Sequence, residues 1–386
     1  MHDRTFNLVI VAGFRLVLSV LTALGTGMAA AQPDASWRSE WPRTDFSKHA
    51  VSFAEIESGG PPKDGIPAID RPQFIAPAKA ARWLDRREPV IVFEHRGDAR
   101  AYPLQVLMFH EIVNDTVGGF PVAVTFCPLC NASIVFDRRV NGAVLDFGTT
   151  GKLRKSDLVM YDRRTESWWQ QFTGKGIVGH YAGITLQQLP STIASFADFR
   201  SAYPKGRVLS RETGFNRPYG KNPYRGYDRI GGQPFLFYDP LDRRLPAMER
   251  VLGVMQDGKV RVYPISVFSA SPVINDEIGR EPIVVFSRDG LLSVLDAELI
   301  RESREIATAA AYSRRISDRV LSFERRDNRI VDRETGSEWD LFGRAIAGPL
   351  KDIRLKSVDN GVHFAFAWLA FNPASEIYGT TQRARK

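Results

Sequence analysis

The sequence contains few of the residues on which disulfide-rich and zinc-rich proteins depend. Its 386 residues include only 2 cysteines and 6 histidines. Two cysteines cannot supply the disulfide framework typical of small secreted domains or a four-cysteine zinc site. They lie in the sequence CPLC, as Cys127 and Cys130, where a disulfide would close too small a loop to stabilise the fold much. We therefore expect both cysteines to serve reactivity or metal binding.

Other absences exclude several classes of function. The chain has no nucleophile elbow, no phosphate-binding glycine loop and no HExxH zinc motif. Cys130 is followed by Asn131, so the CxxCH attachment site of c-type haem is absent too. The net charge is +8 with a pI near 9.5, but the basic residues are dispersed among nearly as many acidic ones. We therefore predict no nucleic-acid partner.

Residues 1–31 have the pattern of a signal peptide. Arg4 and Arg15 precede an uncharged run over residues 16–31, and three alanines before Gln32 fit the cleavage pattern. The alternative is an uncleaved membrane anchor, but the run is shorter than the ~20 residues of a spanning helix. No later segment approaches that length. We expect an exported protein, periplasmic or secreted, with no transmembrane segment in the mature chain.

Short apolar runs between turn residues predict a mainly β fold, in the sense of an α+β protein with few short helices. Gly118-Gly119 and Asn141-Gly142 each separate two such runs, and both pairs are two-residue hairpin signals. Residues 32–85 are dense in proline and glycine, and we expect them to form an irregular N-terminal arm.

Short sequence motifs in the first half of the chain recur in the second half. The sequence RAYP at Arg100 recurs as RVYP at Arg261, and an Asp-Thr-Ser-Trp block that begins at Asp162 recurs at Asp332. We predict two tandem copies of one antiparallel strand-rich domain, over residues 86–205 and 248–375. Residues 206–247, rich in Pro, Gly and Tyr, would connect the copies either as a plain ordered strap or as a lid that contacts a ligand. Residues 376–386 would form a tail.

Residues that differ between the copies are the candidates for chemistry. His110 aligns with Ser271, Cys127 with Ser287 and Cys130 with about Gly290. The residues that both copies keep are expected to be structural, because repeats share packing before they share chemistry; they include Asp162, Trp169, Asp332 and Trp339. The predicted site is therefore Cys127, Cys130 and His110.

The hairpin at Gly118-Gly119 predicts how His110 and Cys127 meet. If Val117 opposes Phe120, the same register sets His110 opposite Cys127, with Cβ atoms roughly 5 Å apart. An imidazole at this distance would lower the thiol pKa or share a metal with the sulfur. In the alternative interpretation, residues 104–109 form a short helix entered through Pro103, and the register does not reach His110.

Three functions remain open at this point. The leading one is thiol-disulfide redox with an unknown thiol or disulfide partner in the envelope, with Cys127 and Cys130 as the dithiol, His110 as the tuning group and no cofactor. The second is a copper or zinc site on the same three residues, completed by one further histidine; the candidates are His49, His95, His180 and His363. The third is a non-catalytic envelope protein.

The sequence resembles one known family over roughly residues 53–375. The resemblance rests on the GGPPKDGIPAID arm, on HEIVND and FCPLC, on the Asp-Arg-Thr-Ser-Trp block and on PYRGYD in the strap. Together these are similar to the bacterial DUF3179 family, whose function is undetermined. Some relatives are described as selenoproteins, with selenocysteine within the motif that matches Cys127 to Cys130, which implies redox chemistry. Other relatives lack the second cysteine, which leaves Cys127 as the surer site.

Overall fold

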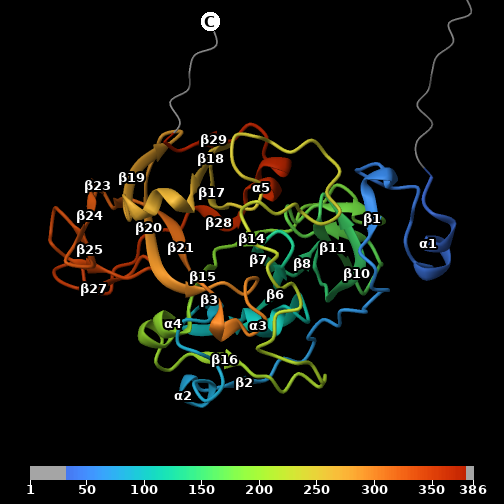
Figure 1. The fold of residues 1–386 in the computed structure, drawn as a ribbon, viewed down its shortest axis with the longest axis horizontal. Helices are drawn as coiled ribbons and strands as arrows, with labels where there is room; N and C mark the ends of the chain where they lie inside the picture. The colour runs from blue at the N-terminus through green and yellow to red at the C-terminus, as the bar shows by residue number, and fades with distance from the viewer. Residues whose placement is uncertain (1–31, 380–386) are drawn as a thin grey trace, which may run out of the picture.

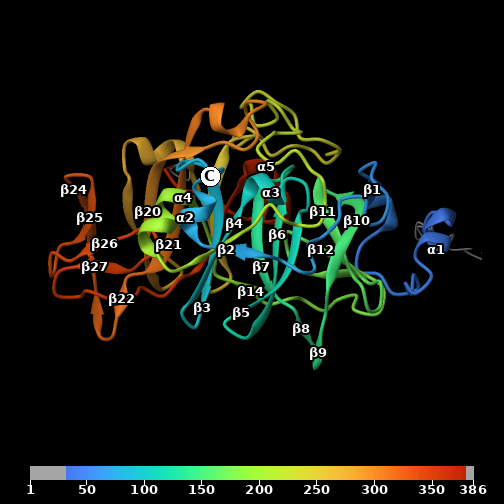
Figure 2. The same ribbon diagram turned by 90° about the horizontal axis from the view of Figure 1, so that it is seen from below.

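A computed structural model describes residues 32–379. The predicted signal peptide, residues 1–31, and the end of the predicted tail, residues 380–386, lie outside the described residues. The fold is mainly β with few short helices, as the sequence predicts. In Figure 1 the first half of the chain (cyan to green) and the second half (orange to red) lie side by side. Figure 2 shows the strap in yellow, on one side of both.

The first half forms three sheets and one small hairpin. Sheet one has the order β15 (Thr192–Ser195), β3 (Pro89–His95), β4 (Asp98–Pro103), β16 (Arg207–Leu209) and β2 (Phe74–Ile75). Sheet two has the order β14 (Gln188–Leu189), β7 (Ala132–Asp137), β6 (Phe120–Cys127) and β5 (Ile112–Val117). Sheet three has the order β1 (Ile56–Ser58), β10 (Phe147–Arg154), β11 (Asp157–Asp162), β12 (Trp168–Gln170) and β13 (Gly176–Val178). The small hairpin is β8 (Arg139–Val140) with β9 (Ala143–Val144).

The second half repeats this plan. Its first sheet has the order β28 (Asp359–Phe364), β17 (Arg250–Gln256), β18 (Lys259–Pro264) and β29 (Glu376–Ile377). Its second has the order β19 (Val273–Ile278), β20 (Glu281–Leu292) and β21 (Glu305–Ser313). Its third has the order β24 (Phe323–Arg326), β25 (Arg329–Asp332), β26 (Glu338–Trp339) and β27 (Ala345–Ala347). The small hairpin is β22 (Arg315–Ile316) with β23 (Arg319–Val320).

The strand orders of the two halves therefore correspond. Strands β15-β3-β4-β16 match β28-β17-β18-β29. Strand β16 runs parallel to β4, as β29 does to β18. Strands β7-β6-β5 match β21-β20-β19, and β10 to β13 match β24 to β27. The correspondence supports the tandem-copy interpretation, although descent from one duplicated domain stays a prediction.

The helices are short and lie mostly at strand ends. They are α1 (Ala35–Glu40), η1 (Phe53–Glu55), α2 (Pro77–Ala80), α3 (Leu104–Leu107), α4 (Phe196–Ala202), η2 (Ile265–Ser269), η3 (Ile300–Glu302) and α5 (Ala365–Phe371). Within residues 32–379, no helix combines the length and hydrophobicity needed to cross a bilayer.

The turn signals in the sequence act as predicted. Gly118 and Gly119 both have positive φ and turn the chain from β5 to β6. Asn141 and Gly142 do the same between β8 and β9. Positive φ at both central residues gives the type of turn whose twist matches a β-hairpin. Val117 pairs with Phe120, as predicted.

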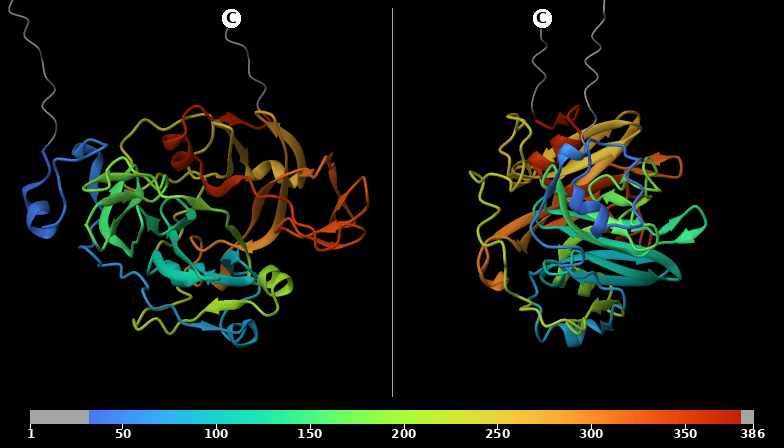
Figure 3. Two further views of the ribbon diagram at one scale, coloured as in Figure 1. Left: turned by 180° about the vertical axis from the view of Figure 1, so that it is seen from behind. Right: turned by 90° about the vertical axis from the view of Figure 1, so that its right-hand side faces the viewer.

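The two halves share buried hydrophobic clusters. Phe126 and Phe136 of the first half belong to the same buried cluster as Phe364 and Leu369 of the second. A second cluster joins Phe196 of α4 to the second half through Phe286 and other residues. Figure 3 shows the two halves from two further sides. The second half therefore packs against the elements that carry the predicted site.

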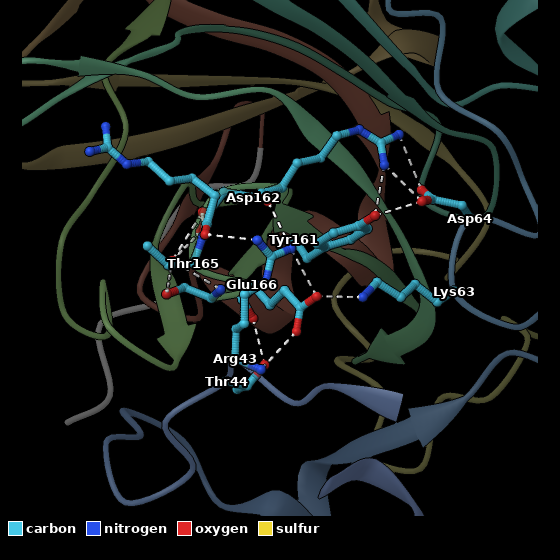
Figure 4. A network of polar contacts seen from close by, with 11 residues as sticks. Arg43, Thr44, Lys63, Asp64, Tyr161, Asp162, Thr165 and Glu166 are labelled. Carbon is cyan, nitrogen blue, oxygen red and sulfur yellow. Dashed lines mark hydrogen bonds and ion pairs between the residues drawn. The ribbon is translucent and has the colours of Figure 1, made fainter. Parts of the chain in front are cut away.

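The N-terminal arm contacts the first half through strands and ion pairs. Strand β1 pairs with β10, and β2 pairs with β16, so the arm is more regular than its sequence suggests. Glu166 accepts hydrogen bonds from Lys63 and from Arg43 of the arm, at 2.7 and 3.1 Å (Figure 4). Tyr161 donates to the Asp64 carboxylate at 2.5 Å. These contacts hold the arm on sheet three.

Candidate functional site

The two cysteines lie at a tight turn inside the protein. Cys127 ends β6 and Cys130 lies just before β7. Both are free thiols, with exposed fractions of 1% and 0%. Asn131, which follows them, has a φ of 50°, a left-handed conformation that asparagine tolerates better than most residues. The second half closes over the turn, because Phe364 N–H donates to the Cys130 carbonyl at 2.9 Å.

The residue that the fold brings to the two sulfurs is Asp157. One of its carboxylate oxygens and the sulfurs of Cys127 and Cys130 all lie within 4.8 Å of one another. Asp157 is fully buried at the start of β11, directly after the Lys155-Ser156 turn of the β10–β11 hairpin. The three groups form the only such cluster of Cys, His and acidic side chains within the described residues.

The Asp157 carboxyl is held in a fixed orientation. Oδ2 accepts a hydrogen bond from Gln170 Nε2 at 2.6 Å and another from Phe172 N–H at 2.9 Å. Oδ1 is buried without an N–H or O–H donor. A buried carboxylate oxygen with no such partner is costly unless a thiol or a metal satisfies it. The geometry therefore leaves one oxygen of Asp157 for the cysteine sulfurs.

Burial sets the protonation states of the site. It raises the pKa of Asp157 to about 7 and raises the pKa of both thiols. Cys127 is the easier thiol to ionise, because hydrogen bonds from the Cys130 thiol and the Leu158 N–H both lower its pKa. The pKa of Cys130 is raised further, since burial and the neighbouring Cys127 and Asp157 all disfavour its thiolate. Cys130 Sγ also lies 3.4 Å from the Ser156 carbonyl oxygen.

His110 does not lie opposite Cys127, so the predicted register is wrong at this end. The pairing of β5 with β6 begins at Ile112 and Thr125. The chain before Ile112 forms α3 and a turn, as the alternative interpretation proposed, because Pro103 starts a helix there. The His110 ring nitrogens instead contact the Pro67 carbonyl at 2.7 Å and the Tyr219 hydroxyl at 2.6 Å.

His110 therefore joins the arm to the strap. Nδ1–H donates to Pro67 of the arm, which leaves Nε2 to accept from Tyr219 of the strap. Burial lowers the pKa of His110 and favours this neutral form. The other four candidate histidines are not beside the sulfurs either: among the described residues, none of His49, His95, His180 and His363 joins the cluster.

The structure also corrects the alignment of the two copies at Cys127. The turns β5–β6 and β19–β20 both contain two residues, so Phe120 corresponds to Glu281 and Pro121 to Pro282. In this register Phe126, rather than Cys127, corresponds to Ser287. Cys127 corresponds to Arg288, an exposed residue that pairs with Asp198.

A second buried acid, Glu111, lies near the cluster. It has an exposed fraction of 6% and a φ of 57°, which is unusual for a residue with a long side chain. Burial raises its pKa to about 8, and the nearby Asp157 adds to the shift. No hydrogen bond to its carboxyl is formed within residues 32–379. The carboxyl instead lines a cavity of about 300 Å³.

The strap covers this cavity. Tyr224, Tyr227 and Phe235 line it from the strap. The cysteines lie close enough to Tyr224 and Tyr227 to influence the pKa of both phenols, which burial raises. Asp228 holds the strap down, because it is fully buried and forms ion pairs with Arg250 and Arg304. The position of the strap over the cavity agrees with the interpretation of the strap as a lid. Contact between the strap and a ligand stays a prediction.

Sequence reasoning missed Asp157 and Glu111. Asp157 belongs to a different hairpin from the cysteines, and no local pattern connects the two. Glu111 carried a usable signal, because the offset of 161 that aligns His110 with Ser271 aligns Glu111 with Pro272. A titratable residue that is absent from the second half was therefore visible beside His110.

The comparisons with known proteins agree with the resemblance seen in the sequence. Residues 63–375 match the family described as "Protein of unknown function (DUF3179)". The match covers most of the chain, so the protein belongs to the DUF3179 family. No curated protein and no solved structure matched the chain.

Proposed function

We propose that the protein is a thiol-disulfide redox protein in which Cys127 and Cys130 alternate between a dithiol and a disulfide. The observation that carries the proposal is the placement of Asp157, with one oxygen free, beside two buried sulfurs. A CxxC dithiol forms a reversible disulfide, and the attacking species is the thiolate. Asp157 supplies the proton acceptor that a buried thiol needs.

The pKa order assigns a role to each group. Burial raises the pKa of both thiols, but less for Cys127, because the Cys130 thiol and the Leu158 backbone partly offset the effect, so Cys127 ionises first. Cys130 remains protonated until a base removes its proton. Asp157, with a pKa near 7, is about half ionised at neutral pH and is therefore suited to accept that proton.

The reaction exchanges one disulfide for another. Cys127 loses its proton, and its thiolate attacks one sulfur of a partner disulfide and forms a mixed disulfide. The other partner sulfur leaves as a thiolate, which takes up that proton. Cys130 then passes its proton to Asp157 and attacks Cys127 Sγ. The Cys127–Cys130 disulfide forms, and the second partner sulfur leaves as a thiolate. Two electrons move from the dithiol to the partner disulfide.

Access and location are part of the proposal. Both sulfurs are buried, so a partner disulfide reaches Cys127 only if a covering segment moves aside. We propose that this segment is the strap around Tyr224 and Tyr227, which lie near both cysteines. We also propose that the protein is exported, since residues 1–31 have the pattern of a signal peptide. A reversible disulfide persists outside the cytoplasm more readily than inside it.

The reaction is tested by trapping the mixed disulfide. Reduced protein is treated with glutathione disulfide, quenched with acid and analysed by intact mass spectrometry. Wild type should pass to the internal disulfide, Cys130→Ser should stop as a mixed disulfide at Cys127, and Cys127→Ser should react least. Asp157→Asn should accumulate the mixed disulfide, because its amide cannot accept the Cys130 proton. Reduced wild type that forms no internal disulfide would contradict the proposal.

A metal site is the second candidate, because the same observation favours it. Two buried sulfurs and the free oxygen of Asp157 would provide three ligands, a set suited to zinc with a fourth position open or, through the sulfurs, to Cu(I). Metal analysis of protein purified without chelators tests this candidate. It predicts stoichiometric metal that is lost in the Cys127→Ser/Cys130→Ser double variant, whereas metal-free protein that takes up neither Zn(II) nor Cu(I) would exclude it.

A further inference from the structure

The cavity beside the cysteines has a lining unlike that of the cysteine site. Its walls are mostly apolar and come from three parts of the chain: the arm through Pro61 and Ile66, the β10–β11 hairpin through Leu153 and Leu158, and the strap. At about 300 Å³ it lies at the lower end of the volumes of ligand pockets. It is therefore large enough for a small molecule and too small for a peptide.

Glu111 is the one acidic residue among those that line this mostly apolar cavity. Glu111 lines the cavity, and its carboxyl has no hydrogen-bond partner among residues 32–379, although the side chain is more than nine-tenths buried. Burial keeps it protonated up to about pH 8, given its raised pKa. A protonated carboxyl is a hydrogen-bond donor. A ligand that accepts a hydrogen bond would therefore give this donor a partner inside the cavity.

The cavity offers nothing to balance a charged ligand. Lys152 also lines it, but its ammonium group is 3.2 Å from Glu40 Oε2 and lies over the Trp37 and Trp168 rings of a separate aromatic cluster. Its charge is therefore already neutralised on the arm side. Aromatic rings of Tyr224, Tyr227 and Phe235 provide flat apolar surface instead.

Glu111 is also held in a costly backbone conformation. Its φ of 57° places a long side chain in the left-handed region, at the junction between α3 and β5. Such strain persists where the surrounding structure enforces it, often at functional sites. The corresponding residue of the second half is Pro272, which cannot adopt a positive φ or donate a hydrogen bond.

We propose that this cavity binds a small, uncharged, largely apolar molecule with a hydrogen-bond acceptor such as a carbonyl group, and that Glu111 donates to that acceptor. The ligand would lie between the strap and the β10–β11 hairpin, beside Leu129 of the CPLC turn. This binding site goes beyond the proposed redox function and does not depend on it, because no step at either sulfur is involved.

The test compares two probes that differ in the acceptor alone. Binding of acetophenone and of ethylbenzene to the reduced, full-length mature protein is measured by ligand-observed NMR. Wild type should bind acetophenone about fivefold more tightly, the effect of one hydrogen bond of about 1 kcal/mol. Glu111→Gln, which keeps an N–H donor, should retain much of this preference, and Glu111→Leu should lose it.

Separate variants test where the two probes bind. Ile66→Trp fills the cavity from the arm and should weaken the binding of both probes, while Cys127→Ser/Cys130→Ser should bind both as wild type does. Circular dichroism confirms folding of each variant. Failure of wild type to bind acetophenone, or equal affinity for the two probes, would overturn the inference. If the cysteine double variant binds both probes normally, ligand binding in the cavity does not depend on the proposed redox reaction.

Discussion

The two halves of the molecule share a scaffold and differ at the ends of two hairpins. In both halves an aspartate accepts hydrogen bonds from a threonine and from a tryptophan seven residues further on. The tryptophan bond is 3.1 Å long from Trp169 to Asp162 and 2.9 Å long from Trp339 to Asp332. In the first half Tyr102 donates at 2.6 Å to Asp115, which also pairs with Arg100. In the second half Tyr263 donates at 2.6 Å to Asp276, which also pairs with Arg261. These shared contacts are buried or partly buried and structural.

The two hairpins that form the site differ in length between the halves, one being shorter in the first half and the other longer. In the first half β6 ends at Cys127 and turns at once into β7, whereas β20 continues to Leu292. The β10–β11 hairpin, by contrast, is the longer one: β11 has 6 residues and β25 has 4. The extra length carries Asp157 to the shortened CPLC turn. The site therefore arises where a shorter turn and a longer hairpin of a common scaffold meet.

We expect Glu111 to give the largest difference between the halves, in the pH dependence of stability, because its counterpart Pro272 does not titrate. The pKa of Glu111 is about 8 in the folded protein and near 4.5 unfolded, so the unfolded chain ionises first as pH rises. Stability from this group is present below pH 4.5 and is lost between about pH 4.5 and 8. Relative to Glu111→Gln, wild type should lose on the order of 4 kcal/mol over that range.

Urea denaturation of both proteins at several pH values measures this loss. The difference between wild type and Glu111→Gln isolates Glu111 from other titrating groups, which both proteins share. A difference that does not change with pH would show that Glu111 is not buried as an acid.

Removing the shared aspartate should affect both halves alike. Asp162→Ala and Asp332→Ala each leave a buried tryptophan ring N–H and a threonine backbone N–H without their acceptor. Each should lower the free energy of unfolding by about 3 kcal/mol, measured by urea denaturation. The matched pair is its own control, and a large cost in one half only would contradict a common scaffold role.

His110→Ser places in the first half the residue that Ser271 provides in the second. It removes the hydrogen bonds to Pro67 and Tyr219 and should cost about 1 to 2 kcal/mol. The pH profile of iodoacetamide labelling of the reduced protein should stay the same, because His110 does not contact either thiol. A profile shifted to higher pH in the folded variant would restore His110 as the group that tunes Cys127.

Local signals in the sequence predicted much of the fold but only part of the site. Gly118-Gly119 and Asn141-Gly142 determine turns by their own backbone preferences, so both hairpins were predictable. The end of the β5–β6 pairing was not, because helix α3 competes with the strand for the residues before Ile112. Asp157 was not predictable either, since its approach to the cysteines depends on how two sheets pack.

The most direct test of the account is a redox titration of Cys127 and Cys130. The protein is equilibrated with glutathione buffers of stepped potential, quenched, and its thiols counted by mass after alkylation. We expect a reversible two-electron transition at a potential above about −300 mV, the range of labile rather than structural disulfides. A transition below that value, or cysteines that remain thiols at every oxidising potential, would contradict it.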